Sequence, residues 1–225
     1  GPEAIAAIVR RSRHVVLKLG PGTDPAAVPG WPEVSLQYVA RGRDLVQAVA
    51  WYGRSGGEPP GSRTASLVPG GPTLGGDPDD GLDPSVLGPP GRSAREWIAT
   101  PPRWLLIPHP AAERARLVSA ALRDCGAPLD GMEPLAAGLG VIASPVDPGS
   151  PWLEAIAIRE AMPWRPLRVR RRLAELGTGE VVVRTRGAAV DPDAAVRAIR
   201  GDAGPMRPVV VLRLGRERVA FLGEA

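Results

Sequence analysis

The sequence is poor in residues that would define several kinds of site. It has one cysteine, Cys125, and two histidines, His14 and His109, far apart in the chain. One cysteine excludes an internal disulfide framework, and we expect a cytoplasmic protein. Two isolated histidines give no basis for a zinc site, so no metal is expected. No run of eighteen apolar residues occurs, which argues against a membrane-spanning helix.

Asparagine is absent, and Lys18 is the only lysine, so every other basic residue is arginine. With abundant Ala, Gly and Pro, this bias indicates GC-rich coding, and the net charge is only +4. The positions of the arginines are therefore more informative than their number. Lys18 suggests a specific need where arginine would not fit, so we single it out as a candidate pocket residue. The alternative is that its stem packs and its ammonium group reaches solvent.

The first 53 residues predict a helix, a strand and a hairpin. Residues 2–13 have helical periodicity and end in arginines, where cations suit the helix dipole. Residues 14–22 form a compact apolar run that ends in Gly-Pro-Gly, as in a buried strand of a parallel sheet. Residues 33–53 alternate around Gly42, which predicts two antiparallel strands joined by a short turn.

Residues 54–92 are dominated by Gly, Pro, Ser and Asp and have few apolar anchors. Such a segment buries too little surface to offset the entropy lost on ordering. We therefore predict a flexible insertion, with bounds of 55–95.

Regular structure is predicted again from Trp104. Residues 104–107 read as a strand, and a helix with apolar residues between Ala112 and Leu122 follows and ends at Gly126. His109 lies between two prolines without an acidic or nucleophilic neighbour, which favours a structural or a surface histidine.

The last 72 residues carry the clearest pattern. It consists of a strand at 154–164, a helix from Pro166 to Gly177, a strand at 180–187, a helix after Asp191, and a hairpin at 207–223. The order β-α-β-α-β-β predicts a small unit of helices on a sheet, of the ferredoxin-like sort.

Several sequence features resemble bacterial class I methyltransferases that end in a THUMP-like domain. They are Met162-Pro163-Trp164, Gly177-Thr178-Gly179, Arg184-Thr185-Arg186-Gly187 and Asp191-Pro192, together with the upstream segments WLLIPHPAAERARLV and HVVLKLGPGTD. The resemblance implies an α/β fold, in which a remnant of a Rossmann-like methyltransferase sheet precedes a small α+β ferredoxin-like (THUMP-like) domain. The implied division is 1–54 for the methyltransferase part, 55–95 for the insertion, 96–150 for a strand-helix connecting region and 151–225 for the THUMP-like domain.

The resemblance also implies a cofactor, S-adenosylmethionine, for the complete enzyme, but this chain lacks a segment suited to bind it. Such cofactors are held by a glycine-rich turn between a strand and a helix. Gly20-Pro21-Gly22 follows a strand, but Pro21 lacks an amide donor, and Gly138-Leu139-Gly140 precedes a strand. We therefore expect no cofactor-binding and no catalytic residues in this chain.

Arginines are concentrated between Arg159 and Arg186, where the sequence has eight arginines and three glutamates. Helix and strand periodicity place Arg168, Arg171 and Arg172 on the outer face of a helix, and Arg184 and Arg186 on one face of a strand. We predict that these five residues contact the phosphates of a structured RNA such as tRNA or rRNA. The alternative is a solvated surface with ion pairs to Glu160 and Glu175.

The leading hypothesis is therefore the C-terminal portion of an S-adenosylmethionine-dependent methyltransferase acting on RNA, whose THUMP-like domain positions the substrate. The alternative is a non-catalytic RNA-binding or interaction protein. The sequence leaves open whether the chain is a fragment, which RNA it contacts and which atom is methylated.

Overall fold

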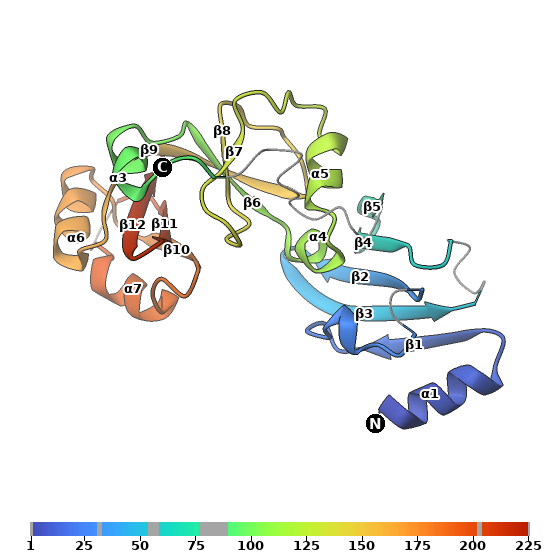
Figure 1. Ribbon diagram of the computed structural model, residues 1–225. Helices are drawn as coiled ribbons and strands as arrows, with labels where there is room; N and C mark the ends of the chain where they lie inside the picture. The colour runs from blue at the N-terminus through green and yellow to red at the C-terminus, as the bar shows by residue number, and fades with distance from the viewer. Residues whose placement is uncertain (1, 31–32, 54–58, 77–89, 202–203, 225) are drawn as a thin grey trace. The chain divides into compact units, whose positions relative to one another are not determined.

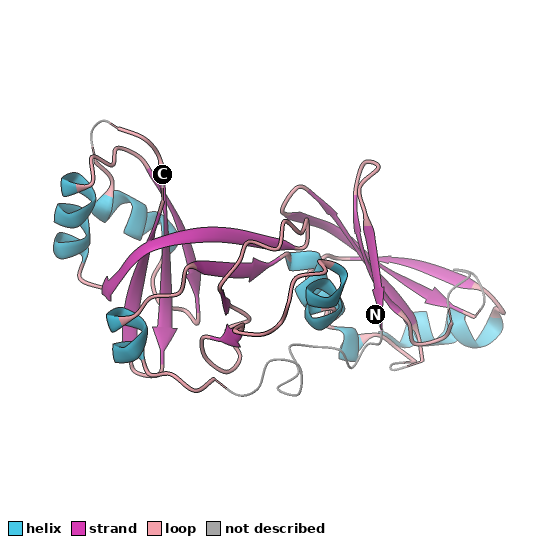
Figure 2. Ribbon diagram, turned by 90° about the horizontal axis from the view of Figure 1, so that it is seen from above, coloured by secondary structure: helices cyan, strands magenta, loops and turns pink. Residues whose placement is uncertain are grey.

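The computed structural model describes residues 2–30, 33–53, 59–76, 90–201 and 204–224, which form two compact units (Figure 1). Unit 1 takes residues 1–86, 108–127 and 150–153, and unit 2 takes residues 87–107, 128–149 and 154–225. The predicted mixed α/β fold is confirmed, and strands dominate both units (Figure 2). The prediction of a separate connecting region at 96–150 is wrong, because this region is divided between the two units. Residues 108–127 belong to unit 1, and the segments 96–107 and 128–149 belong to unit 2.

Unit 1 is built on a five-stranded sheet of order β1-β3-β2-β4-β5, in which only β2 and β4 are parallel. Its elements are α1 (Pro2–Arg11), β1 (Val15–Leu19), the 3₁₀ helix η1 (Pro25–Ala27), β2 (Ser35–Arg41), β3 (Asp44–Tyr52), β4 (Arg63–Leu67), β5 (Thr73–Gly76), α4 (Pro110–Ala115) and α5 (Val118–Asp124). The predicted helix and hairpin are confirmed, and Gly42 provides the turn with a φ of 54°. Helix α4 packs on β2, β3 and β4 and covers one face of the sheet.

The prediction of a buried parallel strand near residue 18 is wrong. Strand β1 lies at one end of the sheet order and pairs antiparallel with β3. Its side chains alternate between buried or half-buried and exposed, and Lys18 is exposed. The continuous apolar run VVLKL therefore has one sheltered face instead of two.

The predicted flexible insertion at 55–95 is wrong where the structure describes it, while 54–58 and 77–89 lie outside the described residues. Within residues 59–76, β4 pairs with β2 and β5 pairs with β4. The anchor is polar, since Arg63 is 1% exposed and its Nη1 donates to the carbonyl oxygens of Val34, Gly61 and Ser62 at 2.7–2.9 Å. These bonds supply the cohesion that apolar residues supply elsewhere.

The single helix predicted after His109 is divided in two. Arg116 adopts the left-handed conformation (φ 59°, ψ 42°) and ends α4, and Leu117 then precedes α5. His109 is structural, one of the two predicted roles, and is 3% exposed. Its Nδ1 accepts the amide hydrogen of Ala111 at 3.1 Å, and its Nε2 lies 2.7 Å from the carbonyl oxygen of Gly42.

Unit 2 is built on a seven-stranded sheet of order β10-β11-β12-β9-β6-β8-β7. Its elements are α3 (Ala94–Ala99), β6 (Trp104–Pro108), β7 (Glu133–Pro134), β8 (Ile142–Ser144), β9 (Leu153–Pro163), α6 (Pro166–Glu175), β10 (Val181–Arg186), α7 (Pro192–Ile199), β11 (Arg207–Leu214) and β12 (Glu217–Gly223). Helix α3 begins with a capping box, in which the amide hydrogens of Glu96 and Ser93 are each accepted by the other residue's side chain. The predicted order of elements after residue 153 is confirmed in full.

The unit 2 sheet is covered on both faces. On one face, Val169 and Leu173 of α6 and Ala195 and Ile199 of α7 pack with Val181 and other strand residues. We call this the helix face. On the other face, Trp97 of α3 packs with residues from β6, β9, β11 and β12, among them Val210, Leu212 and Phe221. Strands β11 and β12 therefore divide their buried side chains between the two cores according to the period of two.

Candidate nucleic-acid interface

Helix α6 presents the first three of the predicted RNA-binding arginines. Pro166 begins the helix at a favoured position, and Val169 and Leu173 point into the core at 0% and 1% exposure. This leaves Arg168 and Arg171 exposed, as the periodicity predicts, and Arg172 partly exposed.

Arg172 is already occupied by two carboxylates. Its Nε and Nη2 donate to the two oxygens of Glu160 at 2.7 and 3.1 Å, and its Nη1 donates to Glu175 at 2.9 Å. The bonds to Glu160, followed by those to Glu175, raise the pKa of Arg172 above its ordinary value, so the guanidinium stays charged. These are the ion pairs that the alternative hypothesis names, and because the carboxylates neutralise Arg172 locally, a phosphate contact at Arg172 stays a prediction. Arg171 lies 3.7 Å from Glu175 with a 75% exposed side chain, a weak pair that leaves it available.

The two strand arginines lie on the opposite face of the sheet. Val181 and Val183 of β10 pack on the helix face, so Arg184 and Arg186 alternate to the other side. The register agrees, because Arg184 pairs with Val210 and Arg186 with Leu212, and both partners belong to the core of the other face. Arg184 also donates to both oxygens of Glu154, at 3.4 and 3.2 Å.

The five predicted arginines therefore do not form one surface. The sheet separates Arg168, Arg171 and Arg172 from Arg184 and Arg186, and carboxylates engage both Arg172 and Arg184 through two hydrogen bonds each to one carboxylate. The sequence pattern gave the face of each arginine on its own element correctly. It did not give the relation between the two elements or the pairing of Arg184 with Glu154, whereas the ion pairs to Glu160 and Glu175 are those that the alternative names.

Two arginines that the sequence analysis did not select lie near the start of α6. Arg165 immediately precedes the helix and is exposed. Arg218, at the start of β12, is exposed, and its carbonyl oxygen accepts the amide hydrogen of Trp164 at 2.8 Å. Among the residues that the structure describes, neither of them nor Arg168 forms an ion pair. The signal that would have selected Arg165 is its position directly before Pro166, at the N-terminus of the helix.

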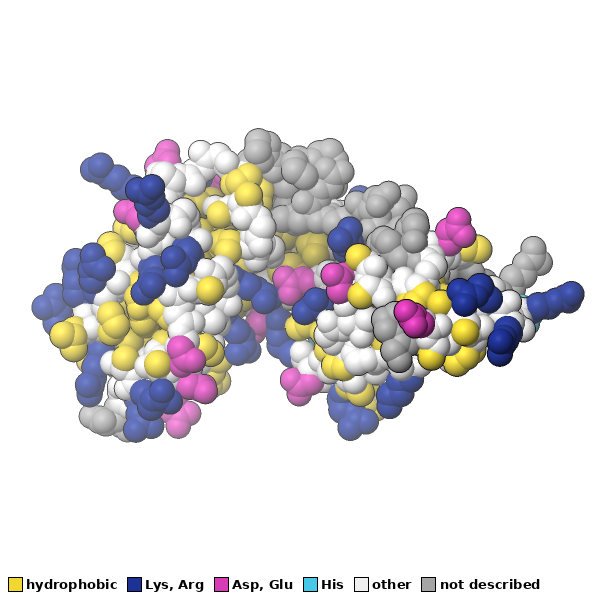
Figure 3. Space-filling model, turned by 60° about the horizontal axis from the view of Figure 1, so that its bottom comes forward, with side chains coloured by type: hydrophobic (Ala, Val, Ile, Leu, Met, Phe, Trp, Pro, Cys, Tyr) yellow, Lys and Arg dark blue, Asp and Glu magenta, His cyan; other side chains and the backbone are white. Residues whose placement is uncertain are grey.

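A groove of about 640 Å³ lies beside these arginines, between the start of α6 and helix α7. We call it the α6–α7 groove. Pro166 and Trp164 line one side, Ala194 and Ala198 of α7 line the other, and Arg218 and Asp191 supply charge. The space-filling view shows apolar surface with Lys and Arg side chains around it at the left, where α6 and α7 lie (Figure 3).

The loop before α7 forms part of this groove and is held in an unusual conformation. Ala188 has a φ of 48°, a region that costs an alanine roughly 1–2 kcal/mol. Arg213 donates from Nε to the carbonyl oxygen of Gly187 at 3.1 Å and from Nη2 to that of Ala188 at 3.0 Å. Asp191 then caps α7 by accepting the amide hydrogen of Ala194 at 2.7 Å. The loop is thus fixed at both ends.

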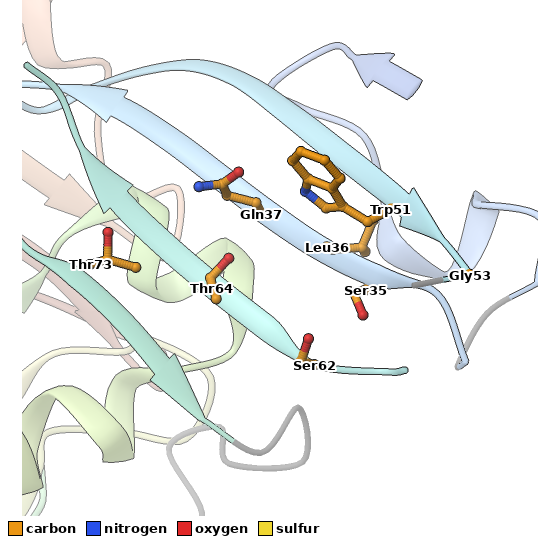
Figure 4. Close-up of a pocket in the computed structure, with 8 residues that line it drawn as sticks. All are labelled: Ser35, Leu36, Gln37, Trp51, Gly53, Ser62, Thr64 and Thr73. Atoms are coloured by element: carbon orange, nitrogen blue, oxygen red, sulfur yellow. The ribbon is translucent and has the colours of Figure 1, made fainter. Parts of the chain in front are cut away.

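Unit 1 carries a second, smaller pocket of about 240 Å³ on the sheet face opposite α4 (Figure 4). Hydroxyl and amide side chains dominate its lining, which includes Ser35, Gln37, Thr64 and Thr73 beside the Trp51 ring. Gln37 donates to Ser66 at 3.0 Å, and Ser66 in turn lies 3.1 Å from the hydroxyl of Thr73. Much of the polar lining therefore satisfies itself.

The candidate pocket residue Lys18 is not part of this lining. It pairs with Val49, which pairs with Gln37, so these three side chains lie in one row on the same face of the sheet. Lys18 is exposed, which agrees with the alternative that its ammonium group reaches solvent. A role in a pocket stays a prediction.

Within the described part of the chain, no group of three or more His, Cys, Asp or Glu residues could hold a metal ion. The helices of that same part include none that is long and apolar enough to cross a membrane.

Comparison with known proteins places the C-terminal elements in a recognised class. Residues 154–225 match the family described as THUMP domain-like. The segment is thus similar to a THUMP domain, and we refer to it as the THUMP-like domain.

The fold as a whole is similar to a crystal structure of a protein described as a putative methyltransferase from Porphyromonas gingivalis W83. The TM-score is 0.69 over 99% of this chain at 12% sequence identity, so the likeness is one of fold. This chain spans 53% of the length of that protein. The sequence matches no curated protein at a significant level.

Proposed function

We propose that this chain is the C-terminal portion of an S-adenosylmethionine-dependent methyltransferase acting on RNA, and that its THUMP-like domain positions the substrate. The observation that carries the proposal is the match of residues 154–225 to the THUMP-like family, on a chain whose fold resembles a putative methyltransferase. The single cysteine supports a cytoplasmic protein.

The described residues do not fit S-adenosylmethionine. After β1, the Gly20-Pro21-Gly22 turn leads into η1, a 3₁₀ helix of three residues, and Pro21 has no amide hydrogen to offer. Gly138-Leu139-Gly140 precedes β8 instead of following a strand into a helix. We therefore propose that the cofactor of the complete enzyme is bound outside this chain, and we derive no catalytic step here.

The proposed contact with RNA is made by exposed arginines that no carboxylate occupies. Arg165, Arg168 and Arg218 meet this condition within the described residues, and Arg171 meets it in part. Each phosphate neutralised releases condensed counterions, so each such arginine contributes to the salt dependence of binding. Arg172 and Arg184 would first have to leave Glu160, Glu175 and Glu154, so they contribute little.

A salt titration with two charge-matched double variants tests the proposal. Arg168→Gln/Arg218→Gln and Arg172→Gln/Arg184→Gln each remove two positive charges from the THUMP-like domain. For a structured RNA such as tRNA, we expect the first pair to reduce the slope of log affinity against log salt by about two counterions. The second pair is expected to leave the slope near that of the wild type.

The proposal fails if the wild type shows no salt-dependent binding to any structured RNA. A non-catalytic interaction protein would then be the better hypothesis. If the two double variants lose the same amount of slope, RNA binding depends only on net charge. Arginines paired with carboxylates would then contribute as much as unpaired ones.

A further inference from the structure

The walls of the α6–α7 groove are unusual for a surface rich in arginine. Ala188 and Ala194 are exposed in it, and Ala198 is half-buried. Each contributes only a methyl group, which leaves a shallow, flat apolar surface. The volume of about 640 Å³ falls within the range of roughly 300–1,000 Å³ typical of small-ligand sites. A longer apolar side chain at Ala194 would project into this space.

Charge distinguishes the kinds of ligand that could occupy the groove. Arg218 and Asp191 are the charged residues of its lining, and the exposed Arg165 directly precedes the lining residue Pro166. An apolar peptide segment would gain nothing from Arg218. An unpaired nucleotide would gain from both parts, because a base offers a flat π-face and its phosphate a negative charge.

Asp191 is the acidic residue of the groove. One of its oxygens is used to cap Ala194, which leaves the other as an acceptor for an exocyclic amino group on the edge of a base. A carboxylate in this position would repel a phosphate, so the phosphate belongs at the Arg218 end.

The loop supports a site that is formed in advance. Arg213 holds two successive carbonyl groups, and Ala188 stays in a backbone region that disfavours alanine. A Cβ atom on Gly187 would lie 2.8 Å from Leu139 Cδ2, so the loop also packs tightly against its surroundings. Strain that surrounding contacts maintain is concentrated at ligand sites.

We propose that the α6–α7 groove binds one unpaired nucleobase of the RNA, with the base on the alanine wall and its phosphate at Arg218. This inference rests on the proposed RNA-binding function and adds the part of the RNA that is recognised. The base is supplied either by a single-stranded 3′ tail or by an internal bulge, and the two sources share the same chemistry.

The test compares two identical substitutions on neighbouring helices. Ala194→Leu fills the groove from an exposed helical position, and Ala174→Leu places the same side chain at an exposed position of α6 outside the lining. Leucine and alanine are both good helix formers, so neither change should unfold the domain. Binding is measured to three RNAs with the same duplex, one blunt, one with a 3′ tail and one with an internal bulge.

We expect the wild type to bind a tailed or bulged RNA more tightly than the blunt duplex. Ala194→Leu should lower the affinity for the tighter RNA to that for the blunt duplex, without affecting the blunt duplex. Ala174→Leu should behave as the wild type with all three RNAs. The RNA whose affinity falls in Ala194→Leu identifies the source of the base.

Two outcomes overturn the inference and can be told apart. If the wild type binds RNA with a salt-dependent affinity but Ala194→Leu binds each of the three RNAs as tightly as the wild type does, the groove does not bind a base and the proposed function stands. If the wild type binds none of the three RNAs, the proposed function fails together with the inference.

Discussion

His109 couples helix α4 to the β2–β3 turn, and the geometry fixes its protonation state. Its Nδ1 accepts the amide hydrogen of Ala111, so Nδ1 carries no proton in the folded chain. Neutral histidine then has its hydrogen on Nε2, which donates to the carbonyl oxygen of Gly42 at 2.7 Å. A second proton on Nδ1 would face the amide hydrogen of Ala111 and end the cap.

The pKa of His109 is lowered in the folded chain. Burial is the largest cause, the bond to Gly42 raises the pKa, and the nearby charge of Arg43 lowers it. The unfolded chain, whose histidine pKa is about 6.5, therefore binds more protons than the folded chain below that pH. Stability thus rises with pH up to about 6.5 and is lost progressively as the pH falls below it.

Two substitutions separate the contributions. His109→Asn keeps an acceptor that can cap α4 but does not reach Gly42, so we expect a loss of about 0.5–1.5 kcal/mol for the missing hydrogen bond. His109→Ala removes the cap as well, which adds about 0.5–2 kcal/mol. Both variants should lose the part of the pH dependence that His109 causes.

The assay is urea unfolding between pH 5 and 8, combined with hydrogen exchange of peptides that cover residues 38–52 and 108–124. Exchange in these peptides reports on unit 1 directly. If the wild type and His109→Asn show parallel pH profiles, or if the wild type gains stability as the pH falls, the assigned protonation state is wrong.

Two further predictions concern the THUMP-like domain. Leu173→Ala, at a site 1% exposed, should cost about 2–5 kcal/mol and speed exchange across α6 and α7, whereas Leu167→Ala, at a site 82% exposed, should cost little; equal costs would contradict the packing described. Ala188→Gly should stabilise the domain by up to about 1 kcal/mol, because glycine tolerates the positive φ of that position, and a lower unfolding midpoint would refute the assigned strain.

Local signals explain why the C-terminal elements could be predicted. Pro166 at the first helical position and the cap at Asp191 each act within one helical turn, so the local sequence is enough to predict where both helices begin. The apolar runs of β11 and β12 on either side of Gly215 are equally local. Most of the apolar residues of these segments are buried in the fold, and the predicted order of elements is therefore confirmed.

The errors arise where distant residues decide. The run VVLKL reads as a central strand, but whether a strand lies at an edge depends on its neighbours in the sheet. The segment 59–76 has few apolar residues, and its order depends on Arg63 reaching carbonyl groups such as that of Val34, 29 residues away. Helix α4 ends at Arg116, and no glycine in the sequence indicates this break.

The candidate site shows the same limit. Periodicity predicts that Arg172 lies on the outer face of its helix and that Arg184 lies on the same strand face as Arg186, and the structure has both on these faces. The ion pair of Arg172 with Glu160 was among the alternatives, but periodicity does not reveal Glu154, which lies 30 residues before Arg184. The α6–α7 groove was also missed, because small residues such as Ala194 and Ala198 carry no chemical signal until two helices are placed side by side.

The interleaved path of the chain through unit 2 has a consequence for how the THUMP-like domain can be studied. The family match begins at residue 154, but the sheet continues into β6, β8 and β7, and α3 covers its second face. A protein cut at residue 154 would lose these partners and expose Val210, Leu212 and Phe221 to water. Such a protein is expected to aggregate, since large apolar patches and open sheet edges associate with one another. The autonomous folding unit is thus larger than the recognisable domain, and it reaches back to segments that the family does not include.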